Sequence, residues 1–147
     1  STVTPGQYTD PIYGFALQIP SGWGLFETGK EAAFRIIGPG DVIVQVSVVL
    51  VPLNMSDSDY SQLLREIRYE PLDGYELISE DEMSLGVLTA RELHFIAMTG
   101  LDQSTNSYLV LDVRQDTQAY IIEAIGPQSG FDSSEDEIRG LIASFRP

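Results

Sequence analysis

The chain has 147 residues, 43% hydrophobic and 20% charged, and its 22 acidic against 8 basic residues give a formal net charge of −14. A chain of this size buries roughly 70% of the surface of its unfolded form, which is enough for one core without a metal or disulfide. The absence of cysteine excludes thiolate catalysis and cysteine-based zinc sites. The negative charge disfavours nucleic acid and anionic membrane surfaces as partners, and no apolar run is long enough to span a bilayer.

Strands are predicted for the first part of the chain, after a small and polar tail or linker at residues 1–7. Alternate apolar residues from Phe15 to Ile19 form the buried side of a strand, which ends at Pro20 because proline cannot donate to a ladder. Trp23 follows a Ser-Gly turn and is expected at the core margin, with its N–H directed to a partner.

Further strands follow, and the strongest of them is Val42–Val51. Shorter strands are expected at Tyr8–Asp10, Leu25–Thr28 and Ala32–Ile37, the last two joined by a turn at Gly29-Lys30-Glu31. One face of the strongest strand is wholly apolar and carries Val42, Val44, Val46, Val48 and Leu50. The other is half apolar and carries Ile43, Gln45, Ser47, Val49 and Val51. This pattern predicts a sheet that is covered on one face and partly covered on the other.

An amphipathic helix is predicted after Asn54, with Ser56 or Ser58 as its N-cap and an end near Glu70, before Pro71. Its apolar stripe follows the helical period and consists of Tyr60, Leu63, Leu64 and Ile67.

The rest of the chain is predicted to form strands and a final helix. The strands are expected at Tyr75–Met83, Val87–Met98, Tyr108–Arg114 and Ala119–Ile125, with Leu109, Leu111 and Val113 on one face of the third. In the final helix, Ser134 and Glu137 have the spacing of a capping box. Its stripe is Ile138, Leu141, Ile142 and Phe145.

Grouped strands with a helix between them and another after them predict an α+β domain rather than strict βα alternation. We expect a central antiparallel sheet of about six or seven strands with two main helices packed on it, in a single domain over residues 8–147.

Short motifs in this order resemble the PsbP-like fold family. The first has the spacing Y-x-D-x-x-x-G-F-x-x-x-x-P-x-x-W and uses Tyr8, Asp10, Gly14, Phe15, Pro20 and Trp23. The later ones are the turn of Leu72, Gly74 and Tyr75, then Gly86, Ala119-Tyr120-Ile121 and the closing Ile142-Ala143-Ser144-Phe145-Arg146. The family includes photosystem II extrinsic PsbP proteins, Ran-binding nuclear transport factors and bacterial domains of the DcrB type. The resemblance implies an α/β/α sandwich around the antiparallel sheet and a role in binding, and it brings no catalytic residues.

Most polar residues with functional potential have a plainer explanation. His94 is the only histidine, no G-x-S-x-G nucleophile motif accompanies it, and we interpret it as a strand residue at the sheet surface or margin. Asp57-Ser58-Asp59-Tyr60-Ser61 begins like a calcium loop, but Gln62 stands where that loop needs glycine, so helix capping is favoured. Asp132, Glu135, Asp136 and Glu137 suit a helix N-terminus in the same way.

Three other features are interpreted as surface or packing features. Glu80-Asp81-Glu82 is expected as a solvated acidic turn between strands, with a docking patch for a basic partner as the alternative. Asn54-Met55-Ser56 matches a weak glycosylation sequon. Core or core-margin packing is the default for the aromatic residues Tyr13, Trp23, Tyr75 and Tyr120. No catalytic, cofactor-binding or metal-binding residue is assigned, and the binding residues are left open.

We therefore interpret the chain as a non-catalytic binding or assembly domain, not an enzyme, that works outside the bacterial cytoplasm. Any signal peptide or lipid-anchor cysteine would lie upstream of Ser1. The expected partner is another protein, with a basic contact surface as one option, and neither a cofactor, nucleic acid nor direct membrane insertion by this domain is expected. The alternative is a cytoplasmic chaperone of the DcrB type that holds an apolar client segment on the half-apolar face of 42–51. An enzyme is the third hypothesis, and the oligomeric state is left open.

Overall fold

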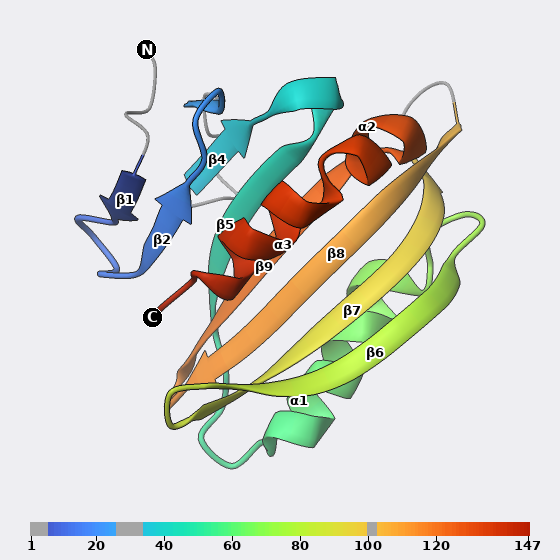
Figure 1. The fold of residues 1–147 in the computed structure, drawn as a ribbon. Coiled ribbons are helices and arrows are strands. Elements are labelled where there is room, and N and C mark those ends of the chain that lie inside the picture. The colour runs from blue at the N-terminus through green and yellow to red at the C-terminus, as the bar shows by residue number, and fades with distance from the viewer. Residues whose placement is uncertain (1–5, 26–33, 100–102) are drawn as a thin grey trace.

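The computed structural model describes residues 6–25, 34–99 and 103–147. Within these residues seven strands form one antiparallel sheet, in the order β3-β4-β5-β9-β8-β7-β6 (Figure 1). The strands are β3 (Gly24–Leu25), β4 (Phe34–Ile37), β5 (Ile43–Leu50), β6 (Glu76–Leu85), β7 (Leu88–Thr99), β8 (Ser104–Gln115) and β9 (Gln118–Pro127). The expected turn at 29–31 lies outside the described residues.

A separate hairpin of β1 (Gly6–Thr9) and β2 (Ala16–Ile19) joins the sandwich at its N-terminal edge. Phe15, Leu17 and Ile19 are buried as predicted. The backbone of Ala16 exchanges two hydrogen bonds of 2.8 Å with Arg146, so the hairpin is fastened to the C-terminal segment.

Two short helices, α2 (Gln128–Ser133) and α3 (Glu135–Ala143), cover one face of the sheet (Figure 1). The predicted stripe of the final helix is confirmed, because all four of its apolar residues are buried in the larger core. The capping box is wrong: the Ser134 side chain makes no cap hydrogen bond, and Glu137 instead accepts a hydrogen bond from the Trp23 indole N–H. Helix α2 was not predicted, because its sequence contains Gly130 and only one large apolar residue, Phe131.

The opposite face is covered by α1 (Asp57–Leu64), which continues into a π-helical turn, η2 (Arg65–Tyr69) (Figure 1). The Ser56 side chain caps α1 by accepting a hydrogen bond of 3.0 Å from the backbone N–H of Asp59. Beneath the helix lies a smaller core that includes Tyr69, Phe95 and Val110. Helices on both faces of one antiparallel sheet confirm the predicted α+β sandwich.

The predicted apolar stripe of the first helix is wrong in part. Tyr60 is buried and Leu64 half-buried, but Leu63 is 40% exposed and Ile67 is 69% exposed. The helix instead turns Ser61 and Tyr69 toward the sheet. The physical reason is that two carboxylates in the sheet, Asp112 and Glu123, accept hydrogen bonds from these two side chains.

Two further predictions about exposed residues are corrected. Leu50 was expected on the core face of its strand but is 82% exposed, because this end of β5 runs beyond the C-terminal helices (Figure 1). Residues 80–82 were expected to form a turn between strands, but they lie inside β6 and pair with 91–93 of β7. Charged side chains are common on an edge strand because they prevent pairing with other chains.

Candidate binding site

An apolar groove of about 500 Å³ runs between β5 and the α1–η2 helix. Val49 of β5 and Ile121 of β9 form its floor. The helix forms its wall with Tyr60, Leu63, Leu64, Ile67 and Arg68. Leu63 and Ile67 are the part of the predicted stripe that the sheet does not cover. Both of them line this groove.

The sheet beside the groove is also incompletely covered. Ile43, Gln45 and Val49 lie on the same face of β5 and are only half-buried. The helix lies over the other half of this face, where the smaller core contains residues of β7, β8 and β9. The expectation that the second face of β5 is only partly covered is therefore confirmed.

A buried carboxylate holds the helix at the edge of the groove. Glu123 of β9 is 2% exposed and accepts hydrogen bonds from Nε and Nη2 of the Arg68 guanidinium, at 3.1 and 2.9 Å. The Tyr69 hydroxyl donates to the same carboxylate at 2.6 Å, and the Gln45 amide donates to it at 2.9 Å. Burial alone would lower the pKa of Arg68, but Glu123 outweighs this effect and the pKa is raised. The fork of Arg68 on Glu123 fixes the orientation of η2.

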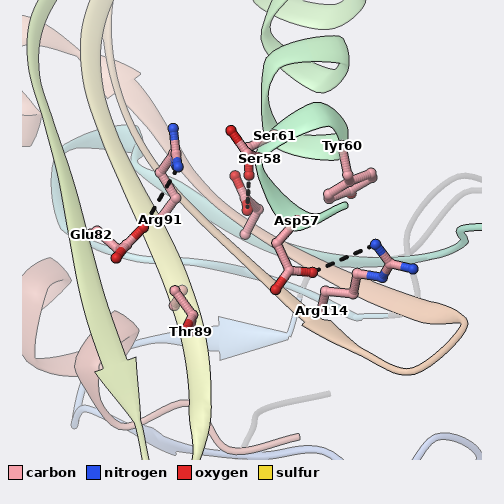
Figure 2. A pocket seen from close by; sticks show the side chains of 10 residues that line it. Asp57, Ser58, Tyr60, Ser61, Glu82, Thr89, Arg91 and Arg114 are labelled. Atoms are coloured by element: carbon pink, nitrogen blue, oxygen red, sulfur yellow. Dashed lines mark hydrogen bonds and ion pairs between the residues drawn. The ribbon is translucent and has the colours of Figure 1, made fainter. Parts of the chain in front are cut away.

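A second, polar pocket of about 260 Å³ lies on the other flank of α1, against β6, β7 and β8 (Figure 2). It is lined by Asp57, Ser58, Tyr60, Ser61, Glu82, Thr89, Ala90, Arg91, Asp112 and Arg114. Tyr60 lines both the groove and this pocket, so α1 is a partition between an apolar and a polar cavity.

Asp112 is the buried charge of the polar pocket and is 4% exposed. Its Oδ1 accepts a hydrogen bond of 3.0 Å from the Ser61 hydroxyl, but its Oδ2 has no hydrogen-bond partner among the described residues. Burial raises the pKa of Asp112 from 3.8 to about 6, which exceeds the opposing effects of the Ser61 hydrogen bond and of Arg91. Perturbed carboxylates of this kind are typical of functional sites.

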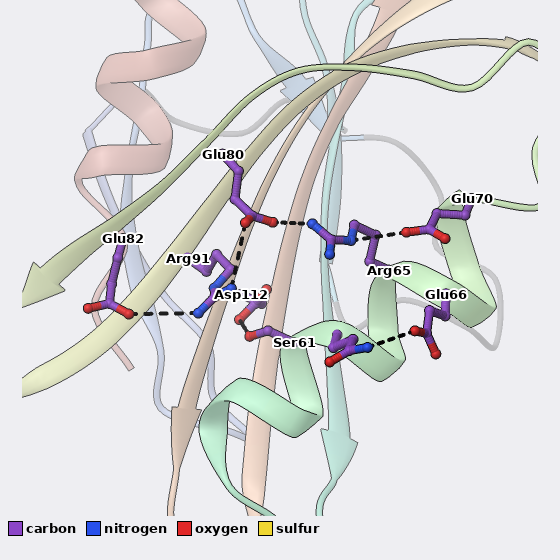
Figure 3. A network of polar contacts seen from close by, with 9 residues as sticks. Ser61, Arg65, Glu66, Glu70, Glu80, Glu82, Arg91 and Asp112 are labelled. Atoms are coloured by element: carbon purple, nitrogen blue, oxygen red, sulfur yellow. Dashed lines mark hydrogen bonds and ion pairs between the residues drawn. The ribbon is translucent and has the colours of Figure 1, made fainter.

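Ion pairs tie the helix to the sheet edge above this pocket (Figure 3). Arg65 pairs with Glu80 of β6 and, at 3.1 Å, with Glu70. Arg91 of β7 lies 3.7 Å from both Glu80 and Glu82. Glu80 and Glu82 of β6 therefore have partners within the chain, which weakens the hypothesis of a docking patch there.

The structure places His94 away from both cavities. It is half-buried on β7, and its ring stacks on Phe131 of α2 with the ring centroids 5.7 Å apart. Burial, followed by the charge of Arg139, lowers the pKa of His94. This environment fits the predicted strand residue.

The other candidate residues make packing or polar contacts within the chain. Asp57 pairs at 3.5 Å with Arg114, whose guanidinium also donates to the backbone oxygens of Pro52 and Met55. Of the four aromatic residues predicted to pack, Trp23 and Tyr120 are buried, Tyr75 is half-buried and Tyr13 is exposed. Within residues 6–25, 34–99 and 103–147 no group of three His, Asp or Glu side chains is placed to hold a metal ion.

Sequence reasoning missed Asp112 and Glu123, which organise this face of the sheet. A signal for them existed: each is a carboxylate set inside an apolar strand, in Leu109–Val113 and Ile121–Ile125. Buried charges are rare in strands and are normally paired, so each predicts a polar contact from another element.

The chain was compared with protein-family models, with curated proteins and with solved structures. No protein-family model and no curated protein matches the chain. Among the described residues, no helix has the length and apolar character needed to cross a membrane.

Several solved structures superimpose on nearly the whole chain. Cyanobacterial PsbP (CyanoP) from Synechocystis matches 95% of this chain and 90% of its own, with a TM-score of 0.72 and 12% identity. LpqN of Mycobacterium tuberculosis matches 100% of this chain and 90% of its own, with a TM-score of 0.64 and 15% identity. The Ran-binding protein Mog1p of Saccharomyces cerevisiae matches 99% of this chain and 96% of its own, with a TM-score of 0.61 and 12% identity. The fold implied by the sequence motifs is thus confirmed: this chain has the PsbP-like fold.

Proposed function

We propose that residues 8–147 form a single non-catalytic binding domain that holds an amphipathic segment of another protein in the groove between β5 and α1–η2. The observation that carries this proposal is the groove itself, whose wall exposes Leu63 and Ile67 although both belong to an apolar helical stripe. Exposed apolar surface in a concave site is typical of a helix-binding groove.

The charge of the domain favours a basic occupant. Asp59 and Glu66 are exposed and lie four residues before and three residues after Leu63, so they share its face of the helix. The whole chain carries a net charge of −14. A segment with an apolar face in the groove and lysines along its edge would satisfy both properties.

The fold neighbours support a protein partner without identifying it. Mog1p is described as a Ran-binding protein, and LpqN as involved in cell envelope biogenesis. For this chain we propose an extracytoplasmic location, in a secreted or membrane-tethered bacterial protein such as a lipoprotein. The second candidate, a cytoplasmic chaperone of the DcrB type, is favoured by the same groove and differs in compartment and client.

The test uses two 18-residue helical peptides, one built of Leu and Lys and the other of Leu and Glu. We expect the Leu/Lys peptide to bind, as measured by fluorescence anisotropy, and the Leu/Glu peptide to bind at least tenfold more weakly. Replacing both groove residues, Leu63→Ser with Ile67→Ser, should weaken binding about tenfold, because roughly 1.4 kcal/mol of apolar contact is lost.

The matched control is Val87→Ser. Val87 is 100% exposed at the β6–β7 turn, and β8 separates β7 from the groove floor on β5 and β9, so its loss should leave peptide affinity unchanged. An affinity that the groove variant leaves unchanged, like the control, would show that the peptide binds by general charge attraction, and the proposal would be abandoned.

A further inference from the structure

The polar pocket of Figure 2 is separate from the groove and lies on the opposite flank of α1. We propose that this pocket binds a primary ammonium group, with Asp112 as the residue that accepts its charge. This proposal does not rest on the groove, and each can fail without the other.

The first argument is the unused bonding capacity of the pocket. Oδ2 of Asp112 has no hydrogen-bond partner among the described residues, and neither has the hydroxyl of Tyr60. Both atoms are buried, so a ligand in the pocket reaches them once the side chains that cover them move aside. A buried carboxylate without a hydrogen-bonded cation is costly, and perturbed carboxylates in a cleft cluster at functional sites. A cationic ligand would supply what Asp112 lacks.

The second argument is that the ion pairs of the lining arginines are made with carboxylates other than Asp112. Arg91 lies between Glu80 and Glu82 at 3.7 Å from each. Arg114 is directed to backbone carbonyls of the loop before α1 and to Asp57 at 3.5 Å. The charge left to be matched in the pocket is therefore that of Asp112.

The third argument selects an ammonium over a guanidinium. Guanidinium groups bind carboxylates best through two parallel hydrogen bonds, but Oδ1 of Asp112 already accepts from Ser61. An ammonium has three donors at one point, and it would meet Oδ2 together with hydroxyl oxygens such as those of Ser58 and Thr89. A volume of about 260 Å³ admits an alkyl chain that carries such a group. The source is either a lysine side chain of a protein or a free alkylamine.

The experiment is an NMR titration of the full chain with n-butylammonium chloride at pH 7.5. We expect saturable shifts of the backbone amides of Ser61, Thr89 and Asp112. The trimethylated analogue, which has no N–H donor, should bind at least tenfold more weakly. Shifts that do not saturate, or equal binding of the two amines, would overturn the proposal.

Variants show whether the shifts belong to the pocket. Asp112→Asn should abolish binding, and Tyr60→Phe should weaken it several-fold. The matched control is Asp116→Asn, the same substitution at an exposed turn after the same strand, where asparagine tolerates the positive φ of 56°. Binding that survives Asp112→Asn would refute the assignment, and circular dichroism of that variant shows whether it is folded.

The affinity for butylammonium should also fall as the pH is lowered. At pH 5 Asp112 is mostly protonated, so butylammonium should bind about tenfold more weakly than at pH 7.5. Asp57 of α1, Glu80 of β6 and Arg91 of β7 also face this carboxylate. The pH dependence should therefore persist in Asp57→Asn and Glu80→Gln, and its loss in either variant would contradict the role of Asp112.

A second probe distinguishes the two sources. The peptide acetyl-Ala-Lys-Ala-amide is compared with butylammonium. Binding at least tenfold tighter for the peptide supports a protein lysine, and equal affinities support a free amine. If neither probe binds, the pocket is not an ammonium site.

Discussion

The burial of Asp112 has an energetic cost at neutral pH, where its carboxyl group is charged. Its pKa is raised in the folded chain, from 3.8 to about 6, so the folded state binds the proton more tightly than the unfolded state does. The resulting stability is fully present below about pH 4 and is lost as the pH rises to about 6. A functional site that costs stability is a common compromise in natural proteins.

The corresponding prediction concerns Asp112→Asn. The difference in the free energy of unfolding between the variant and the wild type should grow in favour of the variant by about 2–3 kcal/mol between pH 4 and pH 7. Urea denaturation at a series of pH values measures this difference. Because other carboxylates titrate equally in both proteins, a difference that stays constant with pH would show that Asp112 has an ordinary pKa.

Among the elements, α2 owes its position to two glycines. A Cβ on Gly130 would lie 2.1 Å from the backbone oxygen of Gly40, and a Cβ on Gly40 would lie 2.7 Å from the Cα of Gly130. Gly40 also has a φ of +74°, which favours glycine. The atoms in contact are backbone atoms of Gly40 and Gly130, so no side-chain movement can make room for an added methyl group.

Gly130→Ala should therefore destabilise the chain by about 2–3 kcal/mol, as an overpacked contact does. Gly140→Ala is the matched control, since this exposed glycine of α3 has nothing within 4 Å of the added Cβ. Removal of a glycine from a helix interior should there stabilise the chain by about 0.5–1 kcal/mol. Thermal unfolding measures both changes, and a similar effect of the two substitutions would show that the Gly40–Gly130 contact is loose.

The element α1–η2 shows how polar anchors select a helix face. Ser61 is bonded to Asp112, and Arg68 and Tyr69 are bonded to Glu123. These anchors turn Leu63 and Ile67 toward the groove. Helical periodicity locates an apolar stripe, but the partners on the sheet decide which part of the stripe is covered.

At the scale of the whole molecule, the excess of acidic residues opposes the compact state. The chain has 22 acids and 8 bases, so the mutual repulsion of its carboxylates should be relieved by salt. Raising NaCl from about 0.05 to 0.5 M at pH 7 should raise Tm by about 3 °C, which corresponds to roughly 1 kcal/mol for a domain of this size.

The control for this prediction is the same salt series near pH 4.5, close to the sequence pI of about 4.1, where the net charge is small and the salt effect should disappear. A Tm that falls with salt at pH 7 would mean that ion pairs such as those of Arg65 and Arg91 outweigh the repulsion.

The sequence by itself determined the α+β class, most strands and the stripe of the final helix. These features follow from local periods of two and 3.6 residues, and burial in the core follows them closely. Helix α2 was not predicted, because its six residues include a glycine and show no clear helical period of apolar residues. The motifs in order also predicted the PsbP-like fold, which the structural comparisons confirm.

Only the tertiary structure decided where the cavities lie. Ser61 and Asp112 are 51 residues apart in the chain, and Arg68 and Glu123 are 55 apart. Their pairing depends on strand register and on the face of the sheet that α1 crosses, neither of which local sequence encodes. Because these long-range polar contacts rotate the helix, they leave an apolar groove on one flank and an unsatisfied carboxylate on the other.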